Sequence, residues 1–192
     1  MSEPRAPHAA KLVIGLFMRQ RELITPVAGD LAACFGAIDM VSPWFDFAGT
    51  NYYETEMGSP LSRRLVVFKD LIRQDALADI KRQTNAIEGR YGREGCRRVN
   101  IDPGYLLRER FVLATGKNFA HRIYIGQGIY ADLTLIYRNG GFEPLAWTYP
   151  DYAGEAMRGY LERVRKKYIE DFKAVKNTRE QDAGHPGKEA PR

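Results

Sequence analysis

The chain has 192 residues, 44% hydrophobic and 28% charged, with a formal net charge of +5 at pH 7. This length allows one well-buried domain and leaves little for a second, and the composition is that of an ordinary globular protein. The longest apolar run, residues 12–18, is too short to cross a bilayer. Two cysteines far apart, neither in a CxxC pair, argue against a disulfide framework and a structural zinc site. We therefore expect a cytoplasmic protein without membrane association.

The first hundred residues alternate predicted strands with two predicted helices. Residues 1–10 contain two prolines and are expected to form a flexible arm. Residues 11–18 form an apolar run that begins after Lys11, which is typical of a strand buried on both faces. The remaining segments predict strands at 38–47, 52–57, 65–68 and 99–101, and helices at 25–36 and 74–89.

This order of elements predicts an α+β protein with a ferredoxin-like βαββαβ core, in which two helices cover one face of an antiparallel sheet. The helix at 74–89 is expected to present Lys81, Arg82 and Glu88 to water. Asp102, Pro103 and Gly104 predict a turn that ends the strand at 99–101.

The second half of the chain predicts more strands and one long helix. Strands at 111–115, 122–125, 129–137 and 142–145 would extend the core as an antiparallel meander. A C-terminal amphipathic helix is predicted at 151–176, with a basic side that is either a solvated face or a contact surface for nucleic acid. Residues 177–192 are polar and aperiodic, so a disordered tail is expected, and a single domain covers 11–176.

Residues 117–137 predict a β-hairpin closed by Gly126-Gln127-Gly128. In the register that this loop favours, Arg122 faces Asp132 and Tyr124 faces Tyr130 on one side of the hairpin. Two interpretations of the charged pair are open. It is a cross-strand ion pair of roughly 0–1 kcal/mol, or Arg122 binds a phosphate while Asp132 holds a metal or a ribose hydroxyl.

The same register pairs Ile125 with Ile129 on the other, apolar side of the hairpin and places His121 there too. His121 is then either a partly buried, hydrogen-bonded residue or a general acid/base. Within the 99–101 strand, Asn100 is a candidate ligand-binding residue. Asp102 is a candidate base or metal ligand, or the first residue of an Asx turn.

Carboxylates in the segment 52–57 suggest a divalent cation. Glu54 and Glu56 would project to the same side of a strand, an arrangement that suits a cation such as Mg²⁺ and equally suits a charged, solvated sheet edge. With Asp132 they form the candidate metal ligands. The basic residues best suited to neutralise an anion are Arg63, Arg64, Arg97, Arg98 and Lys117.

Several nucleotide-binding and hydrolase motifs are absent from the sequence. There is no GxxxxGK[ST], no GxGxxG after a predicted strand and no GxSxG. The strings FDFAGTNYYETEMG (45–58), VNIDPGYL (99–106), KNFAHRIYIGQGIYADLTLIY (117–137) and WTYPDY (147–152) resemble a bacterial family, the domain-of-unknown-function family 4416. Some members carry the label GTP-binding protein, so the resemblance implies nucleotide binding.

Three functions are open on these residues. The first is binding of a phosphorylated small molecule or nucleotide, such as GTP, near Arg122, Lys117 and Arg64, with Tyr124 or Tyr130 as a stacking surface. The second is a metal-dependent phosphoester hydrolase or transferase that uses His121 as acid/base. The third is a non-catalytic adaptor that binds RNA or protein through the basic C-terminal helix.

Overall fold

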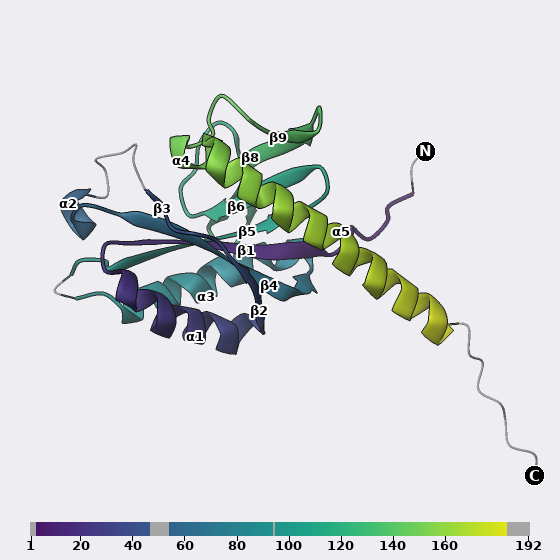
Figure 1. Cartoon of the computed structure of the whole chain (residues 1–192), viewed down its shortest axis with the longest axis horizontal. Coiled ribbons are helices and arrows are strands. Elements are labelled where there is room, and N and C mark those ends of the chain that lie inside the picture. The colour runs from purple at the N-terminus through teal and green to yellow at the C-terminus, as the bar shows by residue number, and fades with distance from the viewer. Residues whose placement is uncertain (1–2, 47–53, 94, 184–192) are drawn as a thin grey trace, which may run out of the picture.

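One large antiparallel sheet organises the chain (Figure 1). The computed structural model describes residues 3–46, 54–93 and 95–183, without the side chains of 54, 55 and 176–183. The strands are β1 (Ala10–Met18), β2 (Ile38–Val41), β3 (Phe45–Asp46), β4 (Ser62–Ile72), β5 (Val99–Leu106), β6 (Arg110–Thr115), β7 (Arg122–Gly126), β8 (Ile129–Arg138) and β9 (Gly141–Pro144). The helices are α1 (Ile24–Phe35), α2 (Glu54–Met57), α3 (Leu77–Arg90), α4 (Pro150–Ala153) and α5 (Glu155–Ala183), with short 3-10 helices at Arg21–Leu23 and Gln74–Ala76.

The strand order is β2-β4-β1-β5-β6-β8-β7, while β3 pairs with β4 and β9 with β8. Every pairing between the described strands is antiparallel. The protein is therefore an α+β protein built on a large antiparallel sheet. All residues of β1 are buried, as the apolar run at 12–18 predicts for a strand with neighbours on both sides and cover on both faces.

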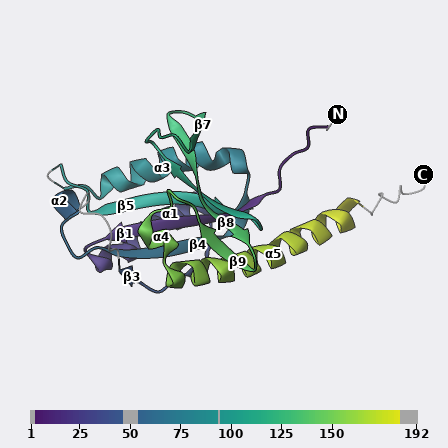
Figure 2. The ribbon, with the colours of Figure 1, turned by 90° about the horizontal axis from the view of Figure 1, so that it is seen from above.

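Helices cover both faces of the sheet at β1 (Figures 1 and 2). Leu12, Ile14 and Leu16 share a cluster with the buried apolar residues of α1 and α3. Val13 shares the cluster of α5 on the other face, because side chains alternate along a strand. Each such leucine or isoleucine contributes about 1.5–3 kcal/mol on full burial. Among the described helices, none is both long enough and apolar enough to span a membrane.

Three expectations about the elements are wrong. Strand β5 does not end at a turn but continues through Asp102-Pro103-Gly104 to Leu106, because β1 pairs with this whole length. Proline is tolerated there because β6 pairs with β5 only from Gly104 onward, which leaves an edge at Pro103. Residues 54–57 form the helix α2 rather than a strand. Helix α5 runs to Ala183, beyond the expected end at residue 176, and only residues 184–192 of the expected tail fall outside the described part.

Two α3 side chains expected in water instead cover the unpaired part of β5. Lys81 is buried and its Nζ donates to the carbonyl oxygen of Ile101 at 2.8 Å. A Glu88 carboxylate oxygen accepts the amide of Ile101 at 2.8 Å, and burial raises the pKa of Glu88. These bonds satisfy backbone groups that β6 does not reach, which is the physical reason that long charged side chains lie on this helix face.

A buried lysine ties α5 to the sheet. Lys11 of β1 is fully buried, and its Nζ lies 2.6 Å from Asp171 Oδ2 and 3.3 Å from Asp39 Oδ2. Lys167 of α5 also contacts both carboxylates. Burial alone would raise the pKa of Asp39 and Asp171, but the hydrogen bonds and charges of the two lysines outweigh it and lower both from the usual 3.8.

This network predicts an acid-sensitive contribution to stability. Because the folded-state pKa values are lowered, the contribution is present above pH 3.8 and is lost as the pH falls through the lowered values. Asp171→Asn should therefore flatten the fall in unfolding free energy below pH 4 in urea titrations. Asp70→Asn, at an exposed aspartate of β4, is the matched control and should leave the slope unchanged. Equal slopes for wild type and Asp171→Asn would contradict the account.

Candidate functional site

Five polar side chains lie near one another on the sheet face that α4 and α5 cover. We call them the polar cluster: Arg63 of β4, Asn100 and Asp102 of β5, and Asp151 and Tyr152 of α4. They are brought together by β1, since Phe17 pairs with both Arg63 and Asn100 and Gly15 pairs with Asp102. Gly15 leaves the room that Tyr152 fills, because a Cβ there would lie 2.6 Å from the Tyr152 hydroxyl.

Arg63 is the centre of the polar cluster and is only 3% exposed. Its Nε lies 2.8 Å from Asp151 Oδ2, and its Nη2 lies 3.7 Å from Asp102 Oδ2. Its guanidinium carbon is 4.6 Å from the centre of the Tyr152 ring. Burial alone would lower the pKa of Arg63, but Tyr152, Asp151 and Asp102 raise it. With Lys81 Nζ 3.6 Å from Asp102 Oδ1, two cations face two carboxylates. With Lys81 included, the polar cluster is balanced in charge.

Arg97 connects the polar cluster to the surface. It donates to both carboxylate oxygens of Glu56, from Nε at 2.7 Å and from Nη2 at 2.6 Å, a bidentate pair of the stronger kind. Its Nη1 donates to Asn100 Oδ1 at 3.0 Å. The Arg97 hydrogen bond lowers the pKa of Glu56. The Asn100 Nδ2 is buried without a hydrogen-bond partner among the described residues.

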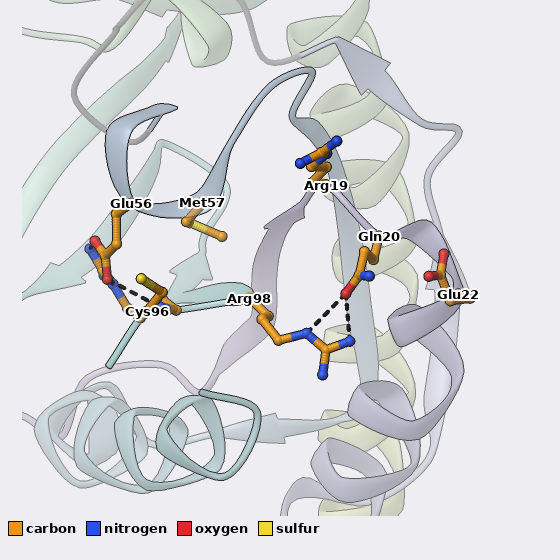
Figure 3. A pocket seen from close by; sticks show the side chains of 8 residues that line it. Arg19, Gln20, Glu22, Glu56, Met57, Cys96 and Arg98 are labelled. Atoms are coloured by element: carbon orange, nitrogen blue, oxygen red, sulfur yellow. Dashed lines mark hydrogen bonds and ion pairs between the residues drawn. The ribbon is translucent and has the colours of Figure 1, made fainter. Parts of the chain in front are cut away.

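A hollow of about 500 Å³ opens beside this bridge (Figure 3). We call it the arginine hollow; it is lined by Arg19, Gln20, Glu22, Glu56, Met57, Cys96, Arg97 and Arg98. Figure 3 shows Glu56, Met57 and Cys96 on one side and Arg19, Gln20 and Glu22 on the other, with Arg98 between them. Arg98 donates to the Gln20 side-chain oxygen from Nε at 2.9 Å. In the described part of the chain, neither Arg19 nor Arg98 forms an ion pair with a carboxylate.

The predicted pair of the hairpin is present but more enclosed than an exposed sheet pair. Arg122 Nε donates to Asp132 Oδ2 at 2.9 Å, and each side chain is 8% exposed. Arg122 also donates to the carbonyl oxygen of Lys117 and to the hydroxyl of Tyr149. This arrangement matches the ion-pair interpretation of the two residues.

The expected position of His121 on the apolar side of the hairpin is wrong. Its Nε2 lies 3.3 Å from Asp132 Oδ2, and its ring stacks on Trp147 with centres 4.9 Å apart. The reason is that β7 begins at Arg122, so His121 precedes the paired strand and does not follow its alternation.

The register of the hairpin is predicted correctly as far as Tyr124, which pairs with Tyr130, their rings 5.3 Å apart. The expected pairing of Ile125 with Ile129 is wrong. A bulge after Tyr124 pairs Ile129 with Gly126 instead. Bulges insert one unpaired residue, which a pattern of alternating residues does not reveal.

The remaining predicted ligands do not form one site with Arg122. Arg64 lies on β4, donates to the carbonyl oxygen of Ser42 and packs over Trp44, with four strands between β4 and β7. Asp102 on β5 and His121 beside β7 are separated by β6 and β8. At about 4.8 Å per strand, β5 and β7 lie roughly 14 Å apart, which argues against the two residues acting on one bond.

The predicted metal ligands are also dispersed. Glu56 pairs with Arg97 and Asp132 with Arg122, while the side chain of Glu54 lies outside the described part. Among the described residues, no group of three or more histidine, cysteine or acidic side chains is placed to hold a metal ion. The hypothetical Mg²⁺ site therefore has no support from the positions of Glu56, Asp102 and Asp132.

Sequence reasoning missed the residues that the structure brings together: Arg19, Gln20, Glu22, Met57, Lys81, Cys96, Asp151 and Tyr152. One signal was available for Arg63. It alternates with Leu65 and Val67, which places a charged residue on the inward face of a strand. A charge in that position has a partner as a rule, and Asp151 is that partner.

Three of the four distinctive strings of the sequence contribute to this region. Residues 45–58 supply Glu56 and Met57, residues 99–106 supply Asn100 and Asp102, and residues 147–152 supply Asp151 and Tyr152. No curated protein and no solved structure is significantly similar to the chain. The family model for a domain of unknown function (DUF4416) matches residues 8–168, so the chain belongs to that family.

Proposed function

We propose that the chain binds a phosphorylated small molecule in the arginine hollow. The observation that carries this proposal is the pair Arg19 and Arg98, which line the hollow without a carboxylate partner in the described part of the chain. Guanidinium groups bind phosphate oxygens through paired, charge-assisted hydrogen bonds. Glu22 and Glu56 also line the hollow, but Glu56 is occupied by Arg97. A bound phosphate would supply the negatively charged partner that Arg19 and Arg98 do not have within the described part of the chain.

The polar cluster helps to hold Arg97, one of the residues that line the arginine hollow, in a fixed position. Arg97 is fixed by Glu56, Glu88 and Asn100, and Asn100 comes from the same strand as Asp102. Residues that bind a ligand work best when neighbouring residues hold their geometry. The position of Arg97 is therefore set before a ligand arrives. Arg19 and Arg98 supply the positive charges that remain available to the ligand.

A nucleotide such as GTP fits the proposal as one class of phosphorylated ligand. We also propose that the β2-β4-β1-β5 order, with α1 and α3 on one face, is a ferredoxin-like core. In this description β6 to β9 form the meander that extends it, and α5 is the amphipathic C-terminal helix. A cytoplasmic location completes the proposal, since phosphorylated metabolites are most abundant there.

A titration with a matched variant tests the binding proposal. Inorganic phosphate, pyrophosphate and GTP are added to the full chain, and binding is measured by calorimetry and by the shift of the melting temperature. Arg98→Ala should weaken binding by about 10-fold or more, because a hydrogen bond to a charged group contributes about 1.5–3 kcal/mol.

Arg73→Ala is the control for this titration, because it removes the same charge at an exposed residue that pairs with Asp75 outside the hollow. It should leave the affinity unchanged. Absence of binding by all three anions, or equal weakening by both variants, would refute the proposal.

A further inference from the structure

The hairpin strand β7 forms an apolar edge of the sheet. In Figure 2 it stands at the outer margin of the molecule, beyond α3. Ile123 is 71% exposed and Tyr124 is 59% exposed, values far above those of a packed strand. Further large exposed side chains adjoin them: Phe119, Ile125, Trp147 and Tyr149. Phe119 and Trp147 both contact His121, and Tyr149 accepts a hydrogen bond from Arg122, so these side chains continue the surface of β7.

This edge lacks the usual protection against strand pairing. Sheet edges are normally guarded by exposed charges or prolines. The charged residue of β7 is Arg122, which is turned onto Asp132 and mostly enclosed. At the opposite edge of the sheet, Pro43 follows strand β2. On β7 the bulge follows Tyr124, so the pairing from Arg122 to Tyr124 remains regular.

We infer that β7 pairs with β7 of a second copy of this chain, in antiparallel orientation, and joins two sheets into one. A twofold axis perpendicular to the sheet keeps each face on its own side. Both copies of Ile123 then share one face and both copies of Tyr124 share the other. Because Asp132 neutralises Arg122 within each chain, the two edges approach without like-charge repulsion.

The exposed apolar area suits a dimer of modest affinity. If each of the six side chains exposes its fraction of about 200 Å², together they expose roughly 600 Å². That area is at the upper limit of the largest apolar patch on an ordinary monomer. It approaches the roughly 800 Å² that each partner contributes to a standard interface. Main-chain hydrogen bonds between the two strands add to it.

Sedimentation velocity and light scattering of the full chain, over a concentration series into the high micromolar range, test the inference. Wild type should shift from monomer to dimer along the series. Ile123→Lys should raise the dissociation constant by about tenfold or more, because it places a charge at the centre of the contact. Val41→Lys is the matched control, since Val41 is 46% exposed on the opposite edge strand β2, and it should dimerise as wild type does.

Two results would overturn the inference. One is a wild-type chain that stays monomeric throughout the series. This result would overturn the inference even if the hairpin bound a different protein. The other is a dimer that Ile123→Lys leaves intact. The melting temperature of each variant shows whether it is folded, and the exposed position of Ile123 makes its loss of fold unexpected. The inference is independent of the arginine hollow, so either proposal can fail alone.

Discussion

Arg63→Met is expected to lower the free energy of unfolding by about 3–5 kcal/mol, the range for removing one partner of a buried ion pair. Methionine fills much of the same volume, but it leaves the Asp151 carboxylate, 7% exposed, without its cation. It also removes the guanidinium group that lies over the rings of Phe17 and Tyr152. Urea denaturation monitored by circular dichroism measures the loss.

Two further variants separate the buried charge from lost packing. Adding Asp151→Asn to Arg63→Met should recover a large part of the loss, because the uncompensated charge is then gone. Arg64→Met, at the next residue of the same strand, should cost much less, since Arg64 is only half-buried and donates to the carbonyl oxygen of Ser42. If Arg63→Met cost no more than Arg64→Met, the polar cluster would not hold this end of the fold together.

Gly104→Ala is expected to cost about 3 kcal/mol, at the upper end of the range for overpacking a buried site. A Cβ at residue 104 would lie 2.4 Å from the carbonyl oxygen of Val112 and 2.9 Å from a methyl group of Leu113. The nearest obstacle is the backbone of β6, so relief requires β5 and β6 to separate where Gly104 pairs with Leu113. The loss is measured by chemical denaturation.

Gly116→Ala is the control for this substitution. Among the described residues, no heavy atom other than those of its two chain neighbours lies within 4 Å of a Cβ at Gly116, and its φ is not in the positive region. Its unfolding free energy should stay near that of wild type or rise slightly, because alanine reduces the freedom of the unfolded chain. If Gly104→Ala were tolerated as well as Gly116→Ala, the close approach of β5 and β6 would not be the reason that residue 104 has to be glycine.

Local signals in the sequence were sufficient to predict the pairing of the hairpin strands but insufficient to predict where β5 ends. The glycines of the loop and the facing charges Arg122 and Asp132 set the pairing as far as Tyr124, since turn geometry and cross-strand pairs act over a few residues. The Asp102-Pro103-Gly104 string carries turn residues, yet it lies in a strand. Pairing with β1, far away in the sequence, outweighs local turn preference there.

The candidate site could not be read from the sequence for the same reason. Arg63 and Asp102 lie on different strands, and their side chains come within 3.7 Å of each other because β1 pairs with both strands. The arginine hollow likewise joins Arg19, after β1, to Arg98, before β5, and β1 pairs with β5 along its length. The sequence identified Arg97 and Arg98 as basic groups suited to an anion. It gave no basis for choosing them over Arg122 and Lys117, because the choice depends on which carboxylates lie nearby.

The most direct test of the central claim is a nuclear magnetic resonance titration of the isotope-labelled full chain with inorganic pyrophosphate. Our account predicts that the largest chemical-shift changes occur at the side chains of Arg19 and Arg98 and at the amide of Cys96. It also predicts that they saturate with the same dissociation constant as the calorimetric signal. Shift changes centred on Arg122, Tyr124 and Tyr130, or no saturable change at all, would contradict it.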